Sequence, residues 1–110
     1  MEMSTAEGYE RVNTEAPVPG ELRLASLADG TRLCVGNSDG VLFVVQDECT
    51  HSGFPLSEGI LLSGGIIQCS WHGARFDCRN GAALQEPAFE PLTCYALRLL
   101  DDGVWVRRSR

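Results

Sequence analysis

Asp-Gly and Asn-Gly pairs divide this chain into short apolar segments, and they constrain its fold more than any other feature. Such pairs readily adopt the positive φ angles of tight hairpin turns. Gly64-Gly65 separates two further apolar segments in the same way. The sequence therefore predicts antiparallel strands joined by short turns, and the pairs that mark them are Asp29-Gly30, Asp39-Gly40, Asn80-Gly81 and Asp102-Gly103.

The segments between these turns are strand candidates. No window of roughly 11 or more residues shows a 3.6-residue apolar period without Gly or Pro, so helices are not expected. Short and regularly spaced strands favour an antiparallel sandwich or barrel, and the predicted fold class is all-β. The predicted strands are 9–13, 21–26, 31–35, 41–46, 60–63, 65–69, 75–77, 92–100 and 104–107.

Length and charge exclude several classes of protein. The chain has 110 residues, which fits one domain, 1–110. Its net charge of −6, from nine Arg and fifteen acids, argues against a nucleic-acid partner. The longest apolar run, 41–45, is far shorter than the roughly 20 residues that cross a membrane. The acidic N-terminus lacks the apolar core of a signal peptide, so we expect a cytoplasmic protein.

The part of the chain from about 47 to 91 differs from the rest. Its apolar segments are shorter, and Cys, His, Gly and Pro gather there. A simple sandwich does not need this composition. We therefore expect a subdomain of loops raised on a β base and built to hold a ligand.

Two short motifs in this part carry the chemistry. Cys49-Thr50-His51 is followed by 17 residues and then by Cys69-Ser70-Trp71-His72, and these are the only two histidines of the chain. Each motif offers one thiolate and one imidazole just after a predicted strand. Cysteines in a cytoplasmic chain favour a metal or thiol role over a disulfide framework.

Two thiolates and two imidazoles suit two kinds of metal centre. One is a structural zinc site, which would make the chain an interaction module. The other is a Rieske-type [2Fe–2S] centre, in which His replaces Cys on one iron. Zinc motifs usually pair like ligands, whereas each motif here pairs unlike ligands. The spacing therefore favours the cluster, with zinc as the alternative.

The residues around these motifs resemble the small Rieske-type ferredoxins of bacterial aromatic ring-hydroxylating dioxygenases. The similarity extends from about 41 to 106. It rests on the ligand motifs and on neighbouring segments, which are Asp47-Glu48-Cys49-Thr50-His51, Leu56-Ser57-Glu58-Gly59, Cys69-Ser70-Trp71-His72-Gly73-Ala74-Arg75-Phe76-Asp77, Asn80-Gly81, Pro87-Ala88 and Pro91-Leu92.

The resemblance implies an antiparallel β-sandwich base with a small, loop-rich cluster-binding subdomain, and one [2Fe–2S] cluster as cofactor. Cys49 and Cys69 would ligate the inner iron, and His51 and His72 the outer iron, where the reducing electron localises. A third loop that contains Pro87 would cover the cluster. Further residues around the cluster would be Gly53, Phe54, Trp71, Gly73, Ala74 and Phe76.

Departures from the high-potential members of the family predict a low reduction potential. Those members carry a disulfide between the ligand loops, at positions that match Phe54 and Trp71. They also place a Ser hydroxyl and a Tyr hydroxyl on cluster or ligand sulfur, where this chain has Ala74 and Phe76. Each lost hydrogen bond removes stabilisation of the reduced state, so we expect a potential of roughly −150 mV.

The resemblance also implies what the chain does. It would be an electron carrier and not an enzyme on its own, because no catalytic triad or phosphate-binding loop is present. Its partners would be a flavin-containing reductase and a terminal oxygenase, with no membrane or nucleic acid, and the carrier would be a monomer. The alternative within the family is the small Rieske subunit of an assimilatory nitrite reductase, or another Rieske carrier. Acids expected to face the partners are Asp47, Glu48, Glu58 and Glu86.

Three cysteines lie outside the motifs. Each falls in or beside a strand candidate, where a thiol behaves as a small buried hydrophobe. We therefore expect no ligand role for Cys34, Cys78 or Cys94.

Overall fold

The computed structural model describes residues 8–50, 53–70, 73–85, 90–100 and 103–108. This part of the chain has ten strands and one short 3₁₀ helix, and it contains no α-helix. The elements are β1 (Glu10–Arg11), β2 (Leu22–Ser26), β3 (Arg32–Ser38), β4 (Val41–Gln46), η2 (Leu56–Glu58), β5 (Ile60–Leu62), β6 (Ile66–Gln68), β7 (Arg75–Asp77), β8 (Ala83–Gln85), β9 (Cys94–Leu100) and β10 (Gly103–Arg108).

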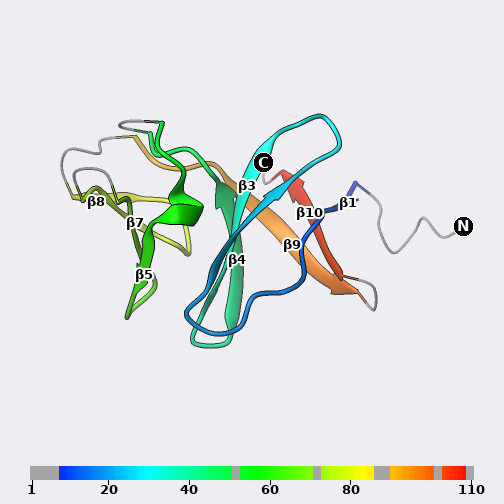
Figure 1. The fold of residues 1–110 in the computed structure, drawn as a ribbon, viewed down its shortest axis with the longest axis horizontal. Coiled ribbons are helices and arrows are strands. Elements are labelled where there is room, and N and C mark those ends of the chain that lie inside the picture. The colour runs from blue at the N-terminus through cyan, green and yellow to red at the C-terminus, as the bar shows by residue number, and fades with distance from the viewer. Residues whose placement is uncertain (1–7, 51–52, 71–72, 86–89, 101–102, 109–110) are drawn as a thin grey trace, which may run out of the picture.

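The strands form two antiparallel sheets. The larger sheet has six strands in the order β1-β10-β9-β4-β3-β2, and the smaller has four in the order β5-β6-β7-β8. Figure 1 shows the small sheet at one end of the long axis, with β1 and β10 on the other side of β3 and β4. The predicted all-β, antiparallel fold is confirmed. No helix among the described residues has the length and apolar character needed to cross a membrane.

The six-stranded sheet curls so that its two edge strands are joined by side chains. The Asn13 amide donates to the Ser26 hydroxyl at 3.2 Å, and the Ser26 backbone N–H donates to the Asn13 amide oxygen at 2.9 Å. The Ala28 N–H donates to the Glu10 carboxylate at 2.6 Å. These bonds cover edges that would otherwise be open to pairing with another chain.

Strands β3 and β4 separate two hydrophobic cores, because alternate side chains of a strand point to opposite faces. Leu33 and Val44 belong to the core inside the curled sheet, which we call the base core. Cys34 and Val45 face the small sheet and belong to a second core, which we call the loop core. The base core consists of Val12, Ala25, Leu33, Val35, Val44, Tyr95, Val104 and Val106. The loop core consists of Cys34, Phe43, Val45, Cys49, Leu56, Ile67, Cys69, Ala74, Phe76, Cys78 and Leu92.

The sequence predicted most strands but missed one. Strand β8 (Ala83–Gln85) was not expected, because its three residues follow Gly81 and offer no clear alternation. Strand β3 continues to Ser38, beyond the predicted end at 35, and β9 begins at Cys94 instead of 92. All four strands of the small sheet lie within the segment 47–91 that was predicted to bind a cluster.

Candidate metal centre

The first ligand loop, which contains Cys49, connects the end of β4 to η2. Cys49 is 2% exposed, and its backbone N–H donates to the Phe54 carbonyl at 2.9 Å. The Gly53 N–H donates back to the Cys49 carbonyl at 2.8 Å. Gly53 has a φ of +76°, which L side chains rarely adopt. These bonds close the loop tightly around its cysteine.

The second ligand loop repeats this geometry after β6. The backbone N–H of Cys69 donates to the Ala74 carbonyl at 2.8 Å, and Gly73 has a φ of +72°. In both loops, the fourth residue after the cysteine is a glycine with a positive φ. The carbonyl that accepts from the cysteine N–H belongs to the fifth residue after the cysteine. The two loops are therefore equivalent when they are counted from the cysteine, although the histidine spacing differs between them.

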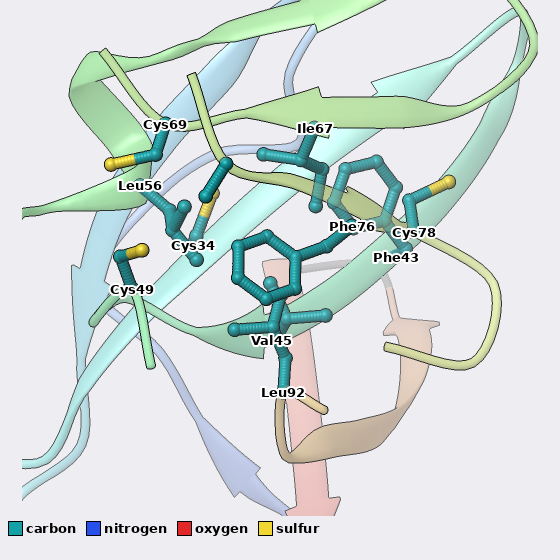
Figure 2. Packing of buried hydrophobic residues seen from close by; sticks show 11 residues of the cluster. Cys34, Phe43, Val45, Cys49, Leu56, Ile67, Cys69, Phe76, Cys78 and Leu92 are labelled. Carbon is teal, nitrogen blue, oxygen red and sulfur yellow. The ribbon is translucent and has the colours of Figure 1, made fainter. Parts of the chain in front are cut away.

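The two cysteine side chains belong to one core. Figure 2 shows Cys49 and Cys69 at the same end of the loop core, with Cys78 at the opposite end. No disulfide joins any two of the five cysteines, all of which are described. Two buried sulfur donors on matched loops fit the cysteine half of a [2Fe–2S] ligand set. His51, Trp71, His72, Glu86 and Pro87 lie outside the described residues.

Helix η2 links the two ligand loops. It is followed by Gly59, where a Cβ atom would overlap the carbonyl oxygen of Gln68, the residue before Cys69. Gly59 has a φ of −86°, so the glycine is needed for space and not for its conformation. The Arg75 guanidinium donates to the Gln68 side chain at 2.8 Å and joins the two strands that flank the second loop.

The segment that precedes β9 is hydrogen-bonded to the first ligand loop and to the end of β4. The Thr50 hydroxyl donates to the Glu90 carbonyl at 2.7 Å. The Gln46 side chain accepts from the Thr93 N–H at 2.7 Å and donates to the Glu48 carbonyl at 2.8 Å. The chain on the C-terminal side of the predicted third loop is thus tied to the first loop.

The prediction that Asp47 is a docking acid is wrong. It is only 1% exposed, so its carboxylate cannot face a partner. One carboxylate oxygen accepts from the Ser57 N–H at 2.7 Å, and the other lies 3.7 Å from the Arg32 guanidinium. Burial raises the pKa of Asp47, while the Ser57 hydrogen bonds and the Arg32 charge oppose that rise. Sequence reasoning missed this role because an acid after a strand is usually exposed. Glu48 and Glu58 are exposed.

The other described cluster neighbours are two buried side chains, one half-buried side chain and two glycines. Ala74 and Phe76 are fully buried in the loop core, and neither side chain has a hydroxyl. Phe54 is half-buried and packs against that core. A Cβ atom at Gly53 or Gly73 would meet no other described atom within 4 Å, so the backbone conformation explains these glycines in the structure.

The remaining cysteines behave as buried apolar side chains. Cys34 and Cys78 are buried in the loop core, and Cys94 is half-buried against it. Burial raises the pKa of all three thiols, which favours the neutral form. Within the described residues, no three His, Cys, Asp or Glu side chains come together in a group that could hold a metal ion.

Comparison with known proteins assigns the family. The model of the Rieske [2Fe-2S] domain matches residues 11–96. The biphenyl dioxygenase ferredoxin subunit of Pseudomonas sp. (strain KKS102) is 39% identical over 92 residues, which cover 84% of each chain. The solved Sphingomonas yanoikuyae B1 ferredoxin is 33% identical, with a TM-score of 0.77, and the match covers 91% of this chain and 96% of that one.

A solved complex of reduced oxygenase and oxidized ferredoxin in carbazole 1,9a-dioxygenase also contains a similar chain. The TM-score is 0.82 at 26% identity, and the match covers 94% of this chain and 98% of that one. The cofactor that these findings assign is one Rieske-type [2Fe–2S] cluster, in agreement with the buried sulfur donors of the two loops. The chain belongs to the Rieske [2Fe-2S] family.

Proposed function

We propose that this chain is the electron carrier of a multicomponent aromatic-ring dioxygenase. It accepts one electron from a flavin-containing reductase and delivers it to a terminal oxygenase. The observation that carries this proposal is the similarity, over most of both chains, to ferredoxin components of such dioxygenases. The chain does not catalyse the oxygenation itself, because the substrate would bind to the oxygenase.

The proposed ligand set is Cys49 and Cys69 on the inner iron and His51 and His72 on the outer iron. When bound, the cluster supplies reversible one-electron chemistry. Two features of the described residues support this set. Cys49 and Cys69 are buried in one core, and their loops share the same closing hydrogen bond.

The surface around the ligand loops is the proposed docking site for both partners. Glu48 in the first loop and Glu58 in η2 are exposed, and the sequence adds Glu86 to this set. Exposed acids attract a basic partner surface over a distance set by the ionic strength. Carriers of this kind make small and transient interfaces, which suits exchange between two partners. The proposed carrier is a cytoplasmic monomer that binds neither membrane nor nucleic acid.

Reconstitution tests this function. The cluster-loaded chain is mixed with the reductase and oxygenase components of a biphenyl dioxygenase, and reoxidation of the dithionite-reduced chain is followed by stopped-flow absorbance. The proposal expects rapid oxidation that requires the oxygenase, and substrate turnover that requires both components. The Cys69→Ala variant, purified without a cluster, is the matched control. Electron delivery to a nitrite reductase large subunit, with none to the oxygenase, would overturn the proposal.

A further inference from the structure

Asp47 is the only fully buried acid among the described residues, and its two carboxylate oxygens have different surroundings. One oxygen accepts from the Ser57 N–H at 2.7 Å. The other is buried and accepts no hydrogen bond from any described atom. Its nearest cation is Arg32, at 3.7 Å, whose side chain is 56% exposed. A buried carboxylate with one oxygen left without a donor is costly, so a purely apolar residue would be expected here.

The backbone of Asp47 joins the first ligand loop to the base. Its N–H donates to the Arg32 carbonyl at 3.2 Å, at the start of β3. Its carbonyl accepts from the Leu56 N–H at 2.7 Å, at the start of η2. Cys49, a proposed cluster ligand, follows two residues later. The carboxylate is thus held at a fixed place, two residues before that ligand in the sequence.

A charge at this place acts on one sulfur atom of the loop core, that of Cys34. Cys34 is a loop-core residue on β3, and the negative charge of Asp47 adds to burial in raising the pKa of its thiol. The same field disfavours any added negative charge nearby. Salt screens the charge of exposed acids such as Glu48. The burial of Asp47 limits this screening of its own charge.

We propose that Asp47 is a positioning residue whose buried negative charge lowers the reduction potential of the cluster. Reduction would add one negative charge to the cluster that the proposed Cys49 ligand helps to hold, and the Asp47 carboxylate would oppose that added charge. This inference rests on the ligand set of the proposed function. It adds a determinant of potential that is separate from the missing hydroxyl groups at Ala74 and Phe76.

The test compares two neighbouring acids that differ in burial. Asp47→Asn keeps an acceptor for the Ser57 N–H and removes the buried charge. Glu48→Gln removes an exposed charge one residue away and is the matched control. Midpoint potentials are measured by mediated spectroelectrochemical titration at pH 8, at low and high salt. We expect the Asp47→Asn potential to rise more than the Glu48→Gln potential, with a rise that persists at high salt. Equal shifts in the two variants would overturn the proposal.

A second variant keeps the proposal testable if Asp47→Asn does not retain a cluster. Arg32→Gln leaves the carboxylate in place and removes its nearest cation, so the potential should fall below that of the wild type. An unchanged potential would overturn the inference. A purely structural role for Asp47 would change thermal stability in Asp47→Asn without moving the potential of the loaded fraction.

The potential is measured without either partner, which separates this inference from the proposed function. A chain whose potential depends on Asp47 but that does not reduce the oxygenase would overturn the carrier proposal alone. A chain that reduces the oxygenase while Asp47→Asn and Glu48→Gln have equal potentials would overturn only the inference.

Discussion

The base core and the loop core share strands β3 and β4 but differ in chemistry. The base core contains no cysteine and receives its side chains mostly from strands of five to seven residues. The loop core contains four of the five cysteines, and the strands of its own sheet have only three residues each. Apolar burial alone can hold the base core together. The loop core also depends on loops whose glycines adopt left-handed conformations.

This difference indicates that the two cores depend on different sources of stability. A metal cluster bound by two loops crosslinks them and adds its binding free energy to folding. Three-residue strands bury little apolar area, so the loop core gains more from such a crosslink than the base core does. The two cores should therefore respond differently to the same kind of change.

Removing a proposed cysteine ligand should have the largest effect. Cys69→Ala is expected to abolish the visible absorbance and EPR signal of the cluster, because one sulfur ligand of the inner iron is lost. Hydrogen exchange should then speed up in β5–β8 and change little in β9 and β10. Cys78→Ala, at the other end of the same core, is the control and should retain the cluster. Equal loss in both variants would contradict the proposed ligand set.

A cavity in the base core should reduce stability and leave the cluster intact. Leu33 is fully buried, so Leu33→Ala is expected to lower the free energy of unfolding by about 2–5 kcal/mol. Denaturant unfolding measures the loss, and the EPR spectrum of the folded protein should not change. Ile67→Ala, the counterpart in the loop core, should both destabilise the fold and weaken cluster retention. Equal cluster loss in the two variants would show that the cores are not independent.

The two ligand-loop glycines should respond alike. Gly53→Ala and Gly73→Ala each force a side chain into a left-handed conformation and should each cost about 1–2 kcal/mol of folding stability. Thermal and denaturant unfolding of the two variants provide the measurement. Gly40→Ala is the control, because Gly40 has a φ of +96° in the turn between β3 and β4 and should leave the cluster unaffected. Clearly unequal losses at Gly53 and Gly73 would contradict the equivalence of the loops.

Restoring the missing hydroxyl groups should raise the reduction potential. Ala74→Ser and Phe76→Tyr would each supply one hydrogen bond that stabilises the reduced state. A bond worth about 1 kcal/mol corresponds to roughly 40 mV for a one-electron couple. Redox titration of the single and double variants tests this expectation against a wild-type value of roughly −150 mV. A wild-type potential well above zero would refute the explanation.

Exposed acids near the ligand loops should have the smallest effect. The double variant Glu48→Gln/Glu58→Gln is expected to slow electron transfer to the oxygenase a few-fold at low salt and hardly at all at high salt. Stopped-flow rates measured across ionic strengths provide the test. Glu15→Gln, an exposed acid before β2, is the control. A wild-type rate that is independent of salt would exclude electrostatic steering.

The base was more predictable from sequence than the loop region. The turn pairs Asp29-Gly30 and Asp39-Gly40 marked the ends of β3, and the apolar run at 41–45 fell in β4. Strand β8 was missed because three residues give too few positions for a period of two. The burial of Asp47 depends on Ser57 and Arg32, which lie 10 and 15 positions away in the sequence. The equivalence of the ligand loops could have been found by counting from the cysteines, since Gly53 and Gly73 both lie four residues on.

EPR of the purified protein, before and after dithionite reduction, tests the central claim most directly when iron and acid-labile sulfide are assayed on the same sample. We expect a silent oxidised state, a rhombic reduced signal with the low average g of a His-ligated cluster, and two irons with two sulfides. A colourless sample that contains one zinc ion, with no EPR signal after reduction, would contradict both the cofactor and the electron-carrier function.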